Sequence, residues 1–89
     1  MNQESQALDL AEAERHLKAA LDVQARLRGL HIEYRASAAE VETIRSRESY
    51  LVASVEAHRR AEGMEPTINE LRNDVRRISA AMISTKDWA

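Results

Sequence analysis

The chain has 89 residues, 44% of them hydrophobic, and a formal net charge of −2 at pH 7. This length supports at most one domain, over residues 1–89, and the hydrophobic fraction excludes a simple disordered tail. The small net charge gives no general attraction to nucleic acid or to an anionic membrane. The chain contains no cysteine, which excludes a disulfide framework and a thiolate metal site.

The composition favours helix. There are only two glycines and one proline, while Ala, Leu, Glu and Arg, which lose little on entering a helix, are frequent. Many of the hydrophobic residues are alanines, so the core of such a domain is thin, and small domains are marginally stable. We therefore expect help from a second copy of the chain or from a partner protein.

Nothing in the sequence indicates export or membrane insertion. The start, Met-Asn-Gln-Glu-Ser, has no basic segment followed by an apolar core, as a signal peptide would. No apolar run is long enough to span a bilayer. We therefore expect a cytoplasmic protein.

The first two thirds of the chain show apolar residues at helical spacing. Residues 4–62 contain no proline and one glycine. The first seam comprises Leu10, Ala13, Leu17 and Ala20. Its phase slips at Val23, and a heptad seam with polar interruptions then continues. That seam comprises Leu27, Leu30, Tyr34, Ser37, Val41, Ile44, Glu48, Leu51, Val55 and His58.

Two all-α architectures fit this pattern, both with coiled-coil-like packing. In one, the chain breaks near Gly29, and Ser37 with Glu40 forms a capping box for the next helix. This version is a three-helix bundle with helices over about 4–28, 37–62 and 67–85. In the other, a single long helix is followed by a C-terminal helical hairpin, as the unbroken heptad phase from Leu27 to Ile44 suggests.

The segment before the last helix has strong turn signals. Gly63 is placed to end a helix in the left-handed conformation, and Pro66 prevents that helix from continuing. Thr67 and Glu70 have the spacing of a capping box. A single apolar seam follows, formed by Ile68, Leu71, Val75, Ile78 and Met82. We therefore predict a helical hairpin at this turn.

The sequence gives little reason to expect catalysis. Glu12 with His16, and His58 with Glu62, are four residues apart, but two ligands do not make a metal site and no HExxH motif is present. There is no glycine-rich phosphate loop, and a thin bundle leaves little room for a concave active site. We expect no enzyme activity, no metal and no cofactor.

The exposed face of the last helix is the best candidate for partner binding. It carries Asn69, Arg72, Asn73, Arg76 and Arg77. Arg and Asn are the side chains that read guanine and adenine edges, and Arg also binds phosphate. Alternatively the face is simply solvated, with local pairs such as Asp74 and Arg77. Trp88 is either a cover for the open end of the bundle or an anchor for a partner.

Together these features predict a small helical protein-protein interaction module that acts through helix-face recognition. An adaptor, an assembly chaperone or an inhibitor of a larger protein would fit, and so would a homodimer. The alternative is a dimeric nucleic-acid-binding regulator that uses the basic face of the last helix.

Overall fold

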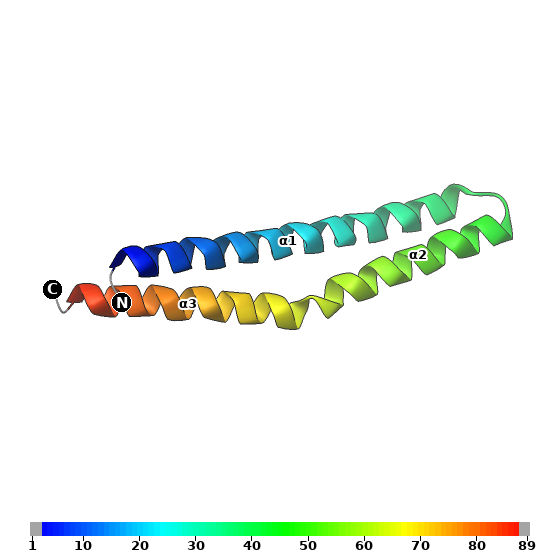
Figure 1. Ribbon diagram of the computed structural model, residues 1–89. Coiled ribbons are helices and arrows are strands. Elements are labelled where there is room, and N and C mark those ends of the chain that lie inside the picture. The colour runs from blue at the N-terminus through cyan, green and yellow to red at the C-terminus, as the bar shows by residue number, and fades with distance from the viewer. Residues whose placement is uncertain (1–2, 88–89) are drawn as a thin grey trace. The chain divides into compact units, whose positions relative to one another are not determined.

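A computed structural model describes the backbone of residues 3–87 and the side chains of residues 4–83. Its elements are α1 (Gln3–Glu40), α2 (Ile44–Gly63) and α3 (Glu65–Asp87), and residues 3–87 contain no strand (Figure 1). The all-α class is confirmed. None of these three helices has both the length and the apolar character needed to cross a bilayer.

The chain divides into two compact units. Unit 1 contains α1 as far as Leu21 together with α3 from Pro66 onward, and unit 2 contains residues Asp22–Glu65. Each unit is therefore a pair of helical segments. The single domain expected over residues 1–89 stays a prediction.

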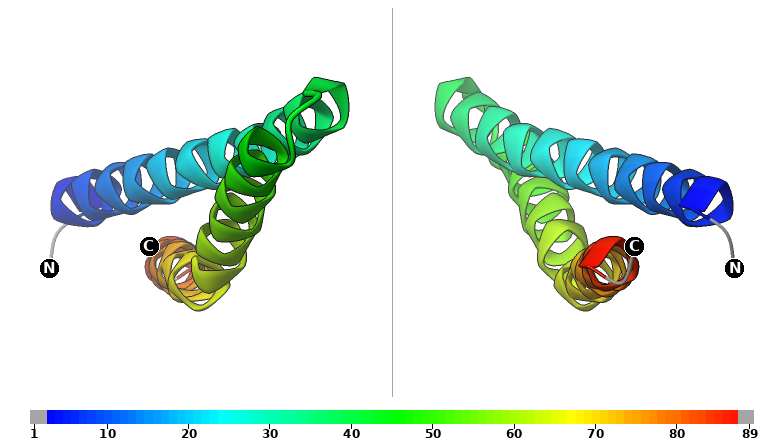
Figure 2. Two further views of the ribbon diagram at one scale, coloured as in Figure 1. Left: turned by 90° about the vertical axis from the view of Figure 1, so that its right-hand side faces the viewer. Right: turned by 90° about the vertical axis from the view of Figure 1, so that its left-hand side faces the viewer.

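Unit 2 is a helical hairpin. The second half of α1 and the whole of α2 run antiparallel, joined by residues 41–43 (Figures 1 and 2). Thr43 is the N-cap of α2, where its extended backbone lets the side-chain hydroxyl accept a hydrogen bond from Ser46 N–H at 3.4 Å. Arg47 Nη2 donates to the Val41 carbonyl at 3.1 Å and ties α2 back to the turn. The arrangement of a long helix with a helical hairpin is confirmed, but the hairpin turn lies at residues 41–43 and not at Gly63 to Pro66, where it was predicted.

The helix break predicted near Gly29 does not occur, because α1 continues through Gly29 to Glu40 (Figure 2). Gly29 does not have a positive φ, and Ser37 lies inside the helix instead of capping a new one. A helical glycine costs only about 1 kcal/mol relative to alanine. The helix pairs with α2 on both sides of this position, and that packing outweighs the cost.

The left-handed helix end predicted at Gly63 is wrong. Gly63 ends α2 without a positive φ, and Met64 follows in the right-handed helical region with φ −81° and ψ −15°. The N–H of Met64 donates to the Ala61 carbonyl at 3.3 Å. Pro66 lies in the first turn of α3, where a missing N–H costs nothing, and Thr67 is already helical. Gly63 and Pro66 therefore lie on either side of a one-residue break, Met64, between α2 and α3.

Unit 1 pairs the first half of α1 with α3, again antiparallel (Figure 1). The seam predicted on α3 is its least exposed face, and Ile68 is completely buried. On α1, Ala13 is buried and Leu10 and Leu17 are half-buried, as predicted. Small side chains opposite larger ones give the narrow core that the composition indicates.

The phase slip predicted at Val23 is absent. Val23 is 51% exposed, whereas Gln24 is 4% exposed and continues the seam. The inward row of α1 keeps spacings of three and four throughout: Gln6, Leu10, Ala13, Leu17, Ala20, Gln24, Leu27, His31, Tyr34 and Ala38. Reading the seam by hydrophobicity alone fails here because polar residues occupy inward positions, among them Gln6, Gln24 and His31.

The face of α2 that packs against α1 also differs from the prediction. Ile44, Glu48, Leu51, Val55 and His58 are all exposed. The inward row is instead Tyr50, Ser54, Ala57 and Ala61, in which every residue but Tyr50 is buried. Small residues at these positions let the two backbones of unit 2 come close. The larger apolar residues of α2 are left on the outside.

Candidate interaction surface

The outward side of α2 is the most unusual surface of unit 2. We define the outer face of α2 as Ile44, Glu48, Leu51, Val52, Val55 and Arg59. The apolar members are 73% exposed at Ile44, 43% at Leu51, 66% at Val52 and 54% at Val55. Single exposed apolar residues are ordinary, but four on one side of a 20-residue helix make this side the candidate interaction surface.

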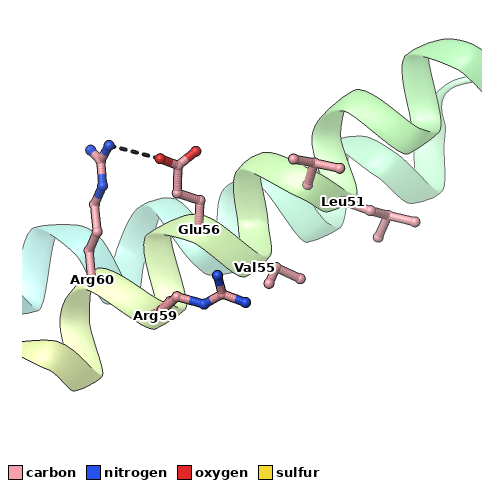
Figure 3. A pocket seen from close by; sticks show the side chains of 6 residues that line it. Leu51, Val55, Glu56, Arg59 and Arg60 are labelled. Carbon is pink, nitrogen blue, oxygen red and sulfur yellow. Dashed lines mark hydrogen bonds and ion pairs between the residues drawn. The ribbon is translucent and has the colours of Figure 1, made fainter.

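Arginine and glutamate surround this apolar patch. A shallow depression on α2 is lined by Leu51, Val52, Val55, Glu56, Arg59 and Arg60. Figure 3 shows Val55 beside Arg59, with Leu51 farther along the helix. Glu56 and Arg60 pair with each other at 2.8 Å. An apolar centre with a charged rim is the usual composition of a protein interface.

Two charges on the outer face have no partner among the described side chains. In the part of the chain whose side chains are described, Glu48 and Arg59 form no ion pair and no side-chain hydrogen bond. Both are exposed. They are therefore free to pair with charges on another molecule.

Polar contacts hold the inward side of α2 and Glu65, the first residue of α3, against α1. Gln24 Nε2 donates to the Ala61 carbonyl at 3.1 Å and to Glu65 Oε1 at 2.8 Å. Arg28 Nη2 reaches the same carboxylate oxygen at 3.2 Å and lies 4.0 Å from Glu62. Because a buried amide must find its partners, these bonds fix the register of α2 along α1 and orient the outer face away from it.

A second polar contact joins His31 and Ser54 at the centre of unit 2. Ser54 Oγ donates to the His31 carbonyl at 3.0 Å. His31 Nδ1 lies 2.9 Å from the Ser54 carbonyl and 2.8 Å from Ser54 Oγ. A carbonyl oxygen only accepts and the single hydroxyl proton is already used, so Nδ1 must carry a proton and donate to both oxygens.

Aromatic rings continue this polar layer. His58 lies with its ring centroid 4.9 Å from that of His31, and Tyr34 and Tyr50 are 6.4 Å apart. The described residues hold no cluster of three or more His, Cys, Asp or Glu side chains that could bind a metal ion. His58 therefore contributes a ring contact to unit 2.

The residues predicted to bind a partner through α3 are all on its surface. Asn69, Arg72, Asn73, Arg76 and Arg77 are exposed, and Trp88 lies outside the described residues. Nothing in the structure shows what they bind, so their role stays a prediction.

The charges of α3 are separated by helix geometry. Glu70 lies two residues before Arg72, and Asp74 lies two residues before Arg76. Two residues correspond to a rotation of about 160° on a helix, so the acidic pair and the basic pair lie on opposite flanks. Arg77 pairs with Asp74 at 3.0 Å, as expected for a solvated face. Arg72 and Arg76 form no ion pair with any described side chain. The free basic surface of α3 is therefore the flank with Arg72 and Arg76.

Sequence reasoning missed the outer face of α2 as a site because it assigned four of its members, Ile44, Glu48, Leu51 and Val55, to the core seam. One signal could have found it: Ser54, Ala57 and Ala61 form a second row at heptad spacing, and small residues permit close helix pairing. Comparison of the chain with protein-family models, with curated proteins and with solved structures finds no match.

Proposed function

We propose that this chain is a cytoplasmic protein-interaction module that binds through the outer face of α2. The observation that supports this most directly is that α2 exposes its large apolar side chains and buries its small ones. Its large apolar side chains Leu51, Val52 and Val55 face outward, while Ser54, Ala57 and Ala61 face α1. If α2 packed only within unit 2, its larger apolar side chains would be expected to face α1.

The apolar side chains of this face supply a free energy comparable with the cost of association. Covering the exposed part of a Val, Leu or Ile side chain contributes about 1–2 kcal/mol. Ile44, Leu51, Val52 and Val55 together would contribute about 4–8 kcal/mol, which is of the order of the cost of association. A partner must therefore bring apolar side chains of its own, as an adaptor target, a client or an inhibited protein would.

Site-specific photo-crosslinking tests this proposal. A photoreactive residue at position 52 should give discrete adducts, either to another protein at low concentration in a lysate or to a second copy of the chain as its concentration is raised, and Val55→Glu in the same chain should abolish them. The control places the same residue at Glu33, which is exposed on α1. Equal adducts from positions 52 and 33, or none from position 52, would refute the proposal.

A nucleic-acid-binding role remains the second candidate, supported by the free flank of α3. Arg72 and Arg76 are four residues apart, exposed, and without an acidic partner among the described side chains. If they contact phosphates, binding to a duplex should weaken steeply with salt, and Arg72→Ala should reduce the salt dependence by about one unit of slope. A failure to bind a duplex at low salt would exclude the nucleic-acid-binding role.

A further inference from the structure

We infer that the outer face of α2 pairs with the same face of a second copy of this chain, with the two α2 helices antiparallel. This inference rests on the interaction function proposed above and names the partner. It is argued from the order of charged and apolar residues along the exposed side of α2.

The exposed side of α2 carries its own heptad row. Arg45, Glu48, Val52, Val55, Arg59 and Glu62 follow one another at spacings of three and four, and all are exposed. Such spacing keeps a row of side chains facing a second helix along its whole length. The row has its two valines at the centre and one positive and one negative charge toward each end.

An antiparallel pair of such rows is complementary. When Val52 lies opposite Val55 of the second copy, Glu48 lies opposite Arg59 of that copy, and Arg45 lies opposite its Glu62. The two-fold symmetry repeats each of these pairs, because the same patch occurs on both copies. Opposite charges at matching positions select both orientation and register.

A parallel pair lacks this complementarity. In parallel register Glu48 would face Glu48 of the second copy and Arg59 would face Arg59, which is destabilising. Glu48 and Arg59 have no partner among the described side chains of their own chain, so their pairing with a second copy breaks no existing ion pair. Glu62 lies 4.0 Å from Arg28 of its own chain, so Arg45 of the second copy would share this carboxylate with Arg28. Leu51, 43% exposed, flanks the row and is further covered by the antiparallel pair.

Sedimentation equilibrium with charge-swap variants tests the inference. The wild type should convert from monomer to dimer between about 1 µM and 1 mM, as expected for a small interface. Glu48→Arg alone and Arg59→Glu alone should each weaken the dimer about tenfold or more, because each creates two like-charge pairs. The double variant Glu48→Arg/Arg59→Glu should restore dimerisation.

An equimolar mixture of the two single variants gives the sharpest result. A chain with Glu48→Arg presents two arginines and a chain with Arg59→Glu presents two glutamates, so only the heterodimer has opposite charges at both pairs. The mixture should therefore dimerise at concentrations where each variant alone is monomeric. Circular dichroism should show that both variants keep the helicity of the wild type, since both positions are exposed.

Three results would overturn the inference. These are a wild type that stays monomeric throughout the range, dimerisation that neither swap weakens, and a mixture no more dimeric than its components. If a photoreactive residue at position 52 still crosslinks to another protein in a lysate, the proposed interaction function holds and only the pairing with a second copy is excluded. If it does not, both proposals fail together.

Discussion

A pair of aspartate substitutions on α2 tests which of its faces is buried. Ala57 is 6% exposed and faces α1, whereas Val55, two residues earlier, is 54% exposed. Hydrophobicity alone predicts that Val55→Asp is the more damaging change. The structure predicts the reverse.

The size of the effect follows from burial. An unpaired carboxylate at the position of Ala57 costs about 3–5 kcal/mol, and the lower helix propensity of aspartate adds about 0.7 kcal/mol. A protein of this length unfolds with about 4–13 kcal/mol, so Ala57→Asp removes a large part of its stability. Val55→Asp should cost less than about 1 kcal/mol.

Urea denaturation followed by circular dichroism at low protein concentration measures both values. Ala36→Asp, at an exposed position of α1, is the control for propensity alone and should cost about 0.7 kcal/mol. The burial also predicts a pH dependence. Desolvation raises the pKa of the introduced carboxyl above its unfolded value, so the penalty at position 57 should shrink as the pH falls from 7 to 4. A larger loss from Val55→Asp than from Ala57→Asp would refute the assignment of faces.

Three further substitutions test other parts of the fold. Gly29→Ala should stabilise the protein by about 0.5–1 kcal/mol, because an added Cβ meets no atom within 4 Å and the backbone is helical; a lower melting temperature would show that α1 breaks there. Val75→Asp should cost about 2–3 kcal/mol by urea denaturation, since Val75 lies in the seam of α3, and unchanged stability would contradict that seam. Ser54→Ala should cost about 1 kcal/mol through loss of the bond to the His31 carbonyl, and a gain in stability would mean that this bond contributes nothing.

The helical class and the α3 seam could be predicted because they depend on local pattern. Ile68, Leu71 and Val75 recur at helical spacing with no competing apolar row, so hydrophobicity identifies the inward face directly. The Asp74–Arg77 pair could be predicted for the same reason, as neighbours three apart on one helix.

The faces of unit 2 could not be predicted in the same way. On α2 two rows compete at heptad spacing, and the row with larger apolar residues, including Leu51 and Val55, is the exposed one. The choice depends on hydrogen bonds between residues far apart in sequence, such as Gln24 with Ala61 and His31 with Ser54. A pattern of apolar residues contains no information about these bonds.

The turns were misread because glycine and proline are ambiguous. Gly63 and Pro66 are as compatible with a first-turn proline as with a left-handed helix end. The real reversal, at residues 41–43, has neither residue and depends on Thr43 as an N-cap. As an indication of a turn in the sequence, Thr43 alone is weaker than Gly63 and Pro66 together.

Single-cysteine alkylation along α2 tests the central claim most directly, because the chain has no cysteine of its own. In dilute solution, cysteines at positions 52 and 55 should react about tenfold or more faster than cysteines at positions 57 and 61. Raising the protein concentration should slow the reaction at positions 52 and 55 and leave positions 57 and 61 unchanged. Fast reaction at 57 and 61 with slow reaction at 52 and 55 would show that the large apolar residues of α2 are core residues, and would contradict the account.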